Sequence, residues 1–311
     1  MLVFDTETRI DETQRLTFGS YQSLIGGWCV EEGIFYGTRL SVKEFGTLKR
    51  YVRAHKPVTV HHGVRELRLL SLSEFLDDVL WLDAYKSRCL LVAFNHPFDL
   101  SRLAYQFTDA RRPFEGGFSL CLWTYRDKHG HEYRNHHRPH VGIKHIDAKR
   151  AFIGFTARKK PDQEDLIPEG SKTARPEKGY KFRGHFLDLR TLAFALTDRG
   201  HSLESACDAF GVEHKKSKVK RHGKITQKYI DYNRRDVLAT SALAEKVIEE
   251  YQRHHIRLQP TKVFSPASIG KGYLRDMGIS PVLRRQPDFP KEFLGYAESA
   301  FYGGRASAPL T

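Results

Sequence analysis

The sequence predicts an α/β fold in which a mixed sheet is flanked by helices, and three observations indicate it. The chain opens with the apolar run Leu2 to Phe4 directly before Asp5, a pattern typical of a buried strand that ends at a sheet edge. Cys89 to Phe94 is a continuous apolar run of the kind found in central strands that are covered on both faces. Thr226 to Tyr251 is the longest helical pattern in the chain.

The first strand carries two acidic residues at its end. Asp5 and Glu7 are two positions apart, so in an extended chain both carboxylates leave on the same face. Two acids on one face repel each other, and a divalent cation held by carboxylate oxygens is the usual agent that offsets the repulsion. Because Asp-x-Glu also marks many solvated strand ends, the pair predicts a magnesium site only if further carboxylates join it.

Strand and helix patterns alternate in the next segments. Leu24 to Tyr36 alternates apolar and polar residues around glycines and predicts a hairpin that pairs with the first strand. Ser41 to His55 and Phe75 to Trp81 have helical spacing.

The central apolar run leads into Asn95-His96-Pro97-Phe98-Asp99, and Leu100 to Phe107 continues with helical character. Asp99 is therefore expected where a central strand meets a helix. Open α/β sheets keep their sites at this carboxyl edge.

The middle of the chain is rich in histidine. Phe118 to Phe155 alternates like strands and contains His129, His131, His136, His137, His140 and His145. Such a set could ligate zinc, but the chain has no Cys-x-x-Cys pair, and Lys128-His129-Gly130-His131 has the composition of a hairpin tip, so we interpret the set as a solvated loop. Lys159 to Lys181 mixes both charge signs with prolines and predicts a surface insertion.

Four further elements are expected before the end of the chain. His185 to Ala195 predicts a short strand and a helix start, with Asp188 at the junction. Ser202 to Phe210 predicts a short helix with Ser202 as N-cap, and a helix is expected from Ser265 to about Met277, opened by Ser-Pro.

Composition favours a polyanionic partner. The 311 residues carry a formal net charge of +14, with 40% hydrophobic and 28% charged residues, as in globular proteins. The excess charge favours nucleic acid or an anionic membrane surface, although it could also belong to a merely basic protein. No run is long enough to cross a membrane or to act as a signal peptide, so we expect a cytoplasmic protein with no membrane partner. Cys29, Cys89, Cys121 and Cys207 are far apart and predict free, mostly buried thiols.

Three segments together resemble a known family. Phe4-Asp5-Thr6-Glu7-Thr8, Asn95-His96-Pro97-Phe98-Asp99-Leu100 and Tyr232-Asn233-Arg234-Arg235-Asp236-Val237 resemble the three exonuclease motifs of the DEDD superfamily, with the third in its tyrosine form. Ser265 to Gly278 and Tyr302-Gly303-Gly304-Arg305 resemble the region after the proofreading exonuclease domain in family B DNA polymerases. The resemblance implies a ribonuclease H-like fold, an exonuclease domain over residues 1–258 with its insertion at about 159–181, and an extension over residues 259–311.

The same resemblance also limits what we expect the chain to do. Nothing after Arg305 matches the palm motifs, so on the family's pattern we do not expect polymerisation. The chain is expected to be either a stand-alone exonuclease or part of a longer polymerase.

The resemblance also implies roles for the acidic residues. Asp5 would bridge two Mg²⁺ or Mn²⁺ ions, Glu7 and Asp236 would complete the water-activating site, and Asp99 would hold the second ion. Tyr232, four residues before Asp236, would orient the attacking water, because a phenol is a poor base at neutral pH. Tyr232 could instead be a tyrosine at the edge of the core. Asp188 is interpreted as structural, since four carboxylates already suffice.

Further residues are candidates for contact with nucleic acid. Asn95 and Phe98 correspond to family positions that contact the terminal nucleotide, although turn formation and packing explain them equally well. The lysine-rich run before the long helix could bind phosphate or form a solvated loop. The complete candidate set is Thr6, Asn95, Phe98, Lys215, Lys216, Lys218, Tyr302, Gly303, Gly304 and Arg305.

We therefore expect a metal-dependent 3′-to-5′ exonuclease that acts on DNA and releases nucleoside monophosphates. An exonuclease that trims RNA is the alternative within the same class. A nucleic-acid-binding or adaptor module with a degenerate site is the alternative from another class.

Overall fold

A six-stranded mixed sheet forms the centre of the molecule. The computed structural model describes residues 1–311 except 58–65, 136, 148–149, 157–181, 214–222 and 302–311. The sheet has the order β12-β5-β1-β2-β3-β4. Its strands are β1 (Leu2–Thr8), β2 (Leu16–Ile25), β3 (Trp28–Tyr36), β4 (Arg68–Ser71), β5 (Leu90–Ala93) and β12 (His185–Asp188). β1, β5 and β12 run parallel to one another, and β2 pairs antiparallel with both β1 and β3.

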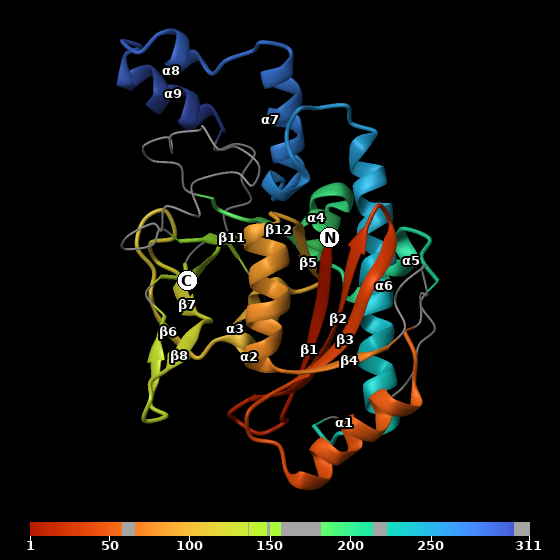
Figure 1. The fold of residues 1–311 in the computed structure, drawn as a ribbon. Coiled ribbons are helices and arrows are strands. Elements are labelled where there is room, and N and C mark those ends of the chain that lie inside the picture. The colour runs from red at the N-terminus through yellow and green to blue at the C-terminus, as the bar shows by residue number, and fades with distance from the viewer. Residues whose placement is uncertain (58–65, 136, 148–149, 157–181, 214–222, 302–311) are drawn as a thin grey trace, which may run out of the picture.

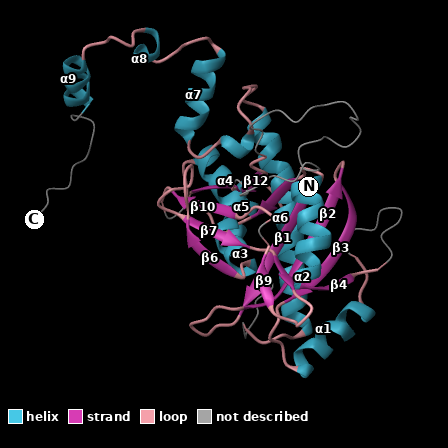
Figure 2. Ribbon diagram, turned by 60° about the vertical axis from the view of Figure 1, so that its left-hand side comes forward, coloured by secondary structure: helices cyan, strands magenta, loops and turns pink. Residues whose placement is uncertain are grey.

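Helices lie on both faces of this sheet, which confirms the predicted α/β fold with a flanked mixed sheet. The helices of the described residues are α1 (Val42–Ala54), α2 (Leu72–Glu74), η1 (Phe75–Lys86), α3 (His96–Leu103), α4 (Leu189–Thr197), α5 (Leu203–Ala209), α6 (Gln227–Gln252), η3 (Pro260–Lys262), α7 (Pro266–Asp276), α8 (Val282–Arg285) and α9 (Lys291–Phe301). Figure 1 shows α6 and the helix that begins at α2 on opposite sides of β1. α7 packs on the body through its buried Ile269, whereas α8 and α9 lie farther out, as Figure 2 also shows.

The period-two alternation of β1 decides which residues meet which helix. Leu2 and Phe4 are fully buried in the core that contains Phe75 of η1, whereas Val3 is buried in the core that contains Val237 of α6. Asp5 and Glu7 share the face of Val3. Both carboxylates therefore face α6.

A second sheet packs against η1. It has the order β11-β10-β7-β6, and a separate two-stranded sheet pairs β8 with β9. The strands are β6 (Gln106–Asp109), β7 (Phe118–Cys121), β8 (Thr124–Arg126), β9 (Glu132–Arg134), β10 (Val141–His145) and β11 (Ala151–Phe155). Trp123 anchors this region, because its indole Nε1 donates to the Leu76 carbonyl at 3.0 Å and its ring is buried.

Side-chain caps begin α1, α5 and α6, whereas Ser265, the N-cap expected for α7, forms no side-chain capping bond. Ser41 and Ser202 form reciprocal capping boxes at α1 and α5, and the Thr226 hydroxyl accepts from the Tyr229 amide at 3.2 Å to begin α6. The predicted helices at 226–251 and 265–277 are confirmed within two residues at each end.

Three boundaries differ from the sequence-based prediction. The hairpin expected at Leu24 to Tyr36 begins at Leu16, because β2 is buried along nearly its whole length and so lacks alternation. The helical character expected for Leu100 to Phe107 ends at Leu103, where the chain turns to pair β6 with β7. The helix expected at Phe75 to Trp81 continues to Lys86 as η1, a wide helix whose end is closed by a bond from the Ser87 amide to the Leu82 carbonyl.

The histidine-rich region is only partly a solvated loop. His129 and His131 are exposed in the β8–β9 turn, where the Asp127 carboxylate accepts from their backbone amides at 2.8 and 2.9 Å. His140, in contrast, is 7% exposed and its Nδ1 lies 2.9 Å from the Ser119 hydroxyl. The prediction of a solvated loop is wrong for His140, because this residue directly precedes β10 and is held there by bonds of its ring to Ser119 and of its backbone to Thr156. His136 lies outside the described residues.

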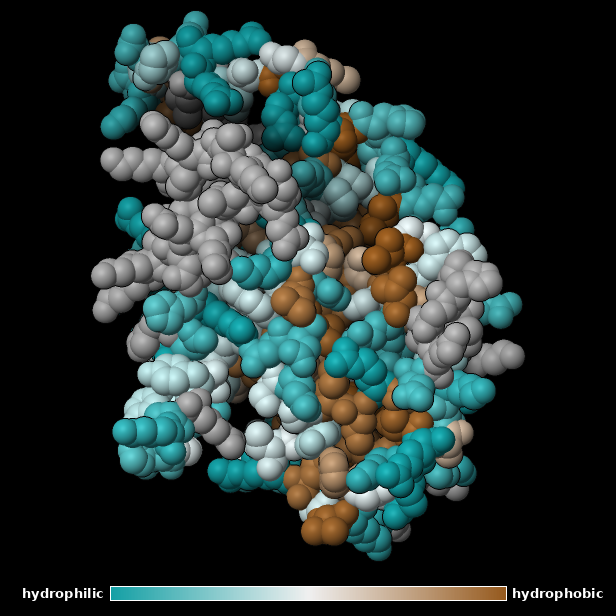
Figure 3. Space-filling model, viewed as in Figure 1, coloured by the Kyte–Doolittle hydropathy of each residue, from teal (hydrophilic) through white to brown (hydrophobic). Residues whose placement is uncertain are grey.

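The cysteines are free, and three of the four are buried. The four cysteines form no disulfide, and Cys29, Cys121 and Cys207 are buried, as predicted. In the described parts of the chain, no helix has both the length and the apolar character needed to cross a membrane. Figure 3 shows a mostly hydrophilic face with an apolar band over the strands of the large sheet and toward α1.

Candidate active site

Three separate segments bring the predicted carboxylates together. β1 carries Asp5 and Glu7, and α3 carries Asp99 just after β5, the parallel neighbour of β1. Thr6 joins the two, because its hydroxyl donates to Asp99 Oδ1 at 2.7 Å and its amide donates to the same oxygen at 3.2 Å. Asp99 is 2% exposed. The strand-to-helix junction therefore places it beside the end of β1, as the sequence predicts.

The buried face of α6 supplies the remaining polar groups. Tyr229, Tyr232, Asn233 and Asp236 follow one another at spacings of three, one and three, so they share the side of α6 that packs on β1. Asn233 Nδ2 donates to Asp5 Oδ2 at 2.6 Å. The Tyr229 hydroxyl donates to Glu7 Oε2, and the Tyr232 hydroxyl is hydrogen-bonded to Asp236.

Sequence reasoning did not assign roles to Tyr229 and Asn233. Both are almost fully buried, with exposures of 1% and 0%. The signal that could have revealed them is the run of polar side chains on the face of α6 that also carries the buried Ile230 and Val237. A buried helix face with hydrogen-bonding groups needs partners, and the acids at the end of β1 are the partners.

Mutual repulsion and burial characterise the electrostatics of the cluster. Burial, followed by the charges of Asp99, Glu7 and Asp236, raises the pKa of Asp5 well above its ordinary value. Burial raises the pKa of Glu7 to about 7, against the opposing effect of the Tyr229 hydrogen bond and with further contributions from Asp236 and Asp99. The pKa of Asp99 is also raised to about 7, mainly by burial and against the two Thr6 bonds.

Asp188 has a structural role at the neighbouring strand end. Its carboxylate accepts from the Thr191 amide at 3.0 Å and so caps α4. It also accepts from the backbone amide of His96 at the start of α3. Asp188 thereby ties α4 to the helix that carries Asp99, which agrees with its interpretation as structural, while its charge adds to the raised pKa of Asp99.

A buried ion pair fixes how α6 is rotated against the sheet. Arg234 lies between Tyr232 and Asp236 in the chain, and its guanidinium donates to Glu32 Oε1 of β3 at 2.6 and 2.8 Å. The same guanidinium donates to the Tyr51 hydroxyl oxygen of α1 at 3.0 Å. Arg234 and Glu32 are 6% and 2% exposed. Because these contacts hold the opposite side of α6, they hold Asn233 and Asp236 toward β1.

Of the residues predicted to contact nucleic acid, the structure describes Thr6, Asn95 and Phe98. Thr6 is buried against Asp99, so its side chain is committed to positioning that carboxylate. Asn95 directly precedes α3 without forming a side-chain cap, and Phe98 is partly buried beneath the Arg102 guanidinium, whose carbon lies 4.9 Å from the ring centre. Lys215, Lys216, Lys218, Tyr302, Gly303, Gly304 and Arg305 lie outside the described residues.

The carboxylates of Asp5, Glu7, Asp99 and Asp236 are suitable ligands for hard divalent cations, although in the described residues they do not surround one common point. Carboxylate oxygens are the ligands that Mg²⁺ and Mn²⁺ prefer. Within the described ranges, no group of three or more His, Cys, Asp or Glu side chains is arranged to hold a metal ion. However, both Thr6 bonds to Asp99 use Oδ1, and Asn233 Oδ1 is a buried acceptor beside Asp5 with no hydrogen-bond partner in the same ranges. The site therefore has spare oxygen ligands where the negative charge is concentrated.

Comparison with known proteins adds no name to this site. No protein-family model and no curated protein sequence matches the chain.

Proposed function

We propose that this chain is a divalent-metal-dependent 3′-to-5′ exonuclease that hydrolyses DNA and releases nucleoside monophosphates. The observation that supports the proposal most is the convergence of Asp5, Glu7, Asp99 and Asp236 from three segments, with a tyrosine hydroxyl on Asp236. A structural carboxylate in a protein interior is normally paired with a cation. In the described part of the chain, Asp5, Glu7 and Asp99 form no ion pair with Lys or Arg.

The four carboxylates are the residues that would hold two Mg²⁺ or Mn²⁺ ions. Bound cations would offset the repulsion among the acids and lower the pKa of a coordinated water. The protein's own part is to position the carboxylates, through Thr6 on Asp99, Asn233 on Asp5 and Tyr229 on Glu7.

Tyr232 is suited to positioning and not to proton removal. Burial and the adjacent Asp236 raise the pKa of its phenol above the ordinary value. The hydroxyl therefore stays protonated near pH 7 and can donate or accept a hydrogen bond, while it cannot act as an effective base. The hydroxyl would orient a water molecule that is bound beside Asp236.

The choice of DNA depends on the resemblance of the motifs to polymerase-associated exonucleases, and the net charge of +14 agrees with a polyanionic substrate. The test uses 3′-labelled single-stranded DNA, duplex DNA and RNA of one sequence, each with Mg²⁺, with Mn²⁺ and with a chelator. We expect labelled mononucleotide from single-stranded DNA with either metal and none with the chelator.

Matched variants make this assay specific. Asp5→Asn removes one carboxylate and should abolish release, whereas Asp208→Asn, an exposed acid of α5, should behave like the parent. Faster release from RNA than from DNA would replace the proposal with RNA trimming. Binding without cleavage under every metal condition would replace it with the adaptor role.

A further inference from the structure

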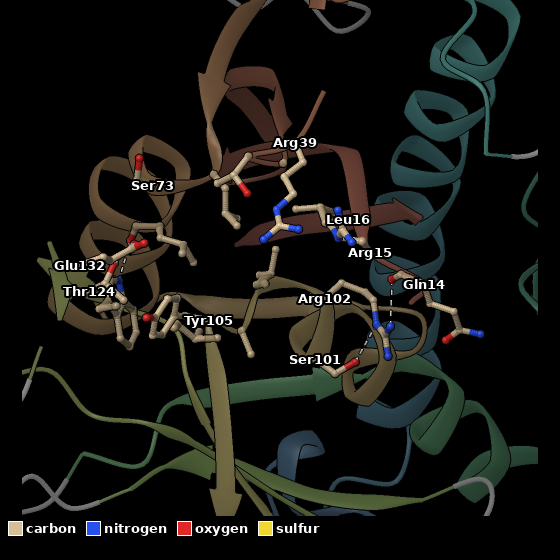
Figure 4. Close-up of a pocket in the computed structure, with 18 of the residues that line it drawn as sticks. Gln14, Arg15, Leu16, Arg39, Ser73, Ser101, Arg102, Tyr105, Thr124 and Glu132 are labelled. Carbon is tan, nitrogen blue, oxygen red and sulfur yellow. Dashed lines mark hydrogen bonds between the residues drawn. The ribbon is translucent and has the colours of Figure 1, made fainter. Parts of the chain in front are cut away.

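A cavity lies near the end of β1, on the side of the large sheet where α3 and η1 pack. Its volume is about 550 Å³, within the range of ligand pockets. It is formed by the loop after β1, the segment after β3, the start of α2 and η1, the end of α3 and the residues that connect β7 to β8. We call it the arginine pocket after Arg15, Arg39 and Arg102, which line one side of it in Figure 4.

The arginine pocket is continuous with the elements that carry the acids. Leu16, which lines the pocket, pairs with Thr8, the residue after Glu7 on β1. Arg102 is one helical turn after Asp99 on α3, a spacing that places two side chains next to each other on a helix. Its guanidinium also lies over the ring of Phe98. A strand whose terminus lay at the carboxylates would therefore reach this pocket with its next nucleotides.

The charge of the pocket is positive. Its acids are Asp77 and Glu132, and Asp77 is already paired with Arg138. Glu132 accepts a hydrogen bond from the Thr124 hydroxyl at 2.7 Å. Arg102 donates to the Gln14 carbonyl at 2.9 Å and to the Ser101 hydroxyl at 3.1 Å, both neutral acceptors.

The other two arginines are available for an anion. Arg15 and Arg39 are exposed, and neither forms an ion pair with any residue in the described ranges. Guanidinium groups bind phosphate through paired N–H donors, and clustered guanidiniums repel each other unless an anion lies between them. Tyr105, on the opposite wall in Figure 4, is 53% exposed and offers a ring on which a base can stack.

We propose that the arginine pocket binds the backbone phosphates of a single-stranded DNA substrate on the 5′ side of the scissile bond. This inference rests on the proposed function, because it takes the carboxylates as the place where the 3′ terminus is cut. Arg15 and Arg39 contact the phosphates, and Arg102 links the pocket to the terminal nucleotide through Phe98.

The test is the salt dependence of strand binding. The double variant Arg15→Gln with Arg39→Gln is compared with the parent for binding of a fluorescent 12-nucleotide single strand between 50 and 300 mM salt, in chelator so that no hydrolysis occurs. Each phosphate contact contributes about 0.7 to the slope of log affinity against log salt for single strands, so we expect a loss of about 1.4. The matched control, Arg199→Gln with Arg257→Gln, removes two exposed arginines outside the pocket and should change the slope by less than about 0.3.

An equal slope change in the two double variants would overturn the proposal. Displacement of the strand from the parent by millimolar inorganic phosphate at constant ionic strength would also overturn it, because an isolated anion would then be the preferred ligand. If the double variant does not fold, Arg39→Gln alone is measured, with an expected loss of about 0.7.

The strand-binding pocket and the exonuclease activity can be refuted independently of each other. A slope change without any cleavage by the metal-loaded parent would remove the exonuclease proposal and keep the strand-binding pocket. Cleavage by the parent without a slope change would keep the exonuclease and remove the pocket.

Discussion

Replacing Asp99 by Asn tests whether the buried carboxylate of Asp99 destabilises the fold when no cation is bound. The substitution preserves size, and the Asn Oδ1 can still accept both Thr6 bonds that now reach Asp99 Oδ1. It removes only the buried negative charge. We therefore expect Asp99→Asn to be more stable than the parent at neutral pH in the absence of divalent cations, although it should be inactive.

The size and pH range of this effect come from the raised pKa. The pKa of Asp99 rises from 3.8 to about 7 on folding. Below pH 4 the carboxyl is protonated in both the folded and the unfolded chain, so it contributes no difference. Between pH 4 and 7 only the unfolded chain releases the proton, and the folded parent loses about 1.4 kcal/mol per pH unit. The total is about 4 kcal/mol above pH 7, as an upper bound.

The assay is urea unfolding of both proteins in chelator at several pH values from 4 to 8. The variant and the parent should have similar free energies of unfolding at pH 4, and the variant should be more stable by a few kcal/mol at pH 8. Asp208→Asn, an exposed acid, is the control and should match the parent at every pH. A difference between Asp99→Asn and the parent that does not grow with pH would refute the cost of burying the ionised carboxylate of Asp99.

Three further substitutions test the supporting residues. Tyr232→Phe should lower turnover by about 10- to 1000-fold with little change in substrate binding, since it removes only an orienting hydroxyl; single-turnover rates equal to the parent would return Tyr232 to a packing role. Tyr229→Phe removes the hydrogen bond that opposes the raised pKa of Glu7, so the acidic limb of the pH–rate profile should move to higher pH, and an unmoved limb would contradict that contact. Arg234→Met leaves Glu32 buried without its partner and should lower the free energy of unfolding by about 3–5 kcal/mol. The control Lys246→Met breaks an exposed pair with Glu249 and should lower it by less than about 1 kcal/mol. Equal losses of the two variants in urea unfolding would refute the role of the buried pair.

Local patterns predicted the main elements because the same periodicities decide burial. The run Leu2 to Phe4 and the run Cys89 to Phe94 became neighbouring parallel strands, and the capped helices begin at the predicted residues. β2 was misjudged because a strand buried on both faces carries no alternation, and even its polar Ser20 and Gln22 are buried. β6 was missed because its pairing with β7 comes from tertiary contact and not from its own apolar pattern.

The site was predictable to the extent that chemistry depends on spacing. The sequence placed Asp5 and Glu7 at a strand end, Asp99 at a strand-to-helix junction and Asp236 on a helix face. These positions were enough to predict that the four carboxylates lie near one another. Tyr229 and Asn233 were not assigned, because a buried polar residue is recognised only when its partner across the fold is known. The pairing of Arg234 with Glu32 is equally long-range, since 202 positions separate them.

Direct measurement of Mn²⁺ binding tests the central claim, that these carboxylates form a divalent-cation site. The parent and Asp5→Asn are titrated with Mn²⁺ at pH 8, where the acids with pKa values near 7 are ionised, and free Mn²⁺ is monitored by electron paramagnetic resonance. The parent should bind about two ions per chain, and Asp5→Asn should lose this binding while it remains folded. No binding by the parent, or identical isotherms for the two proteins, would contradict the account.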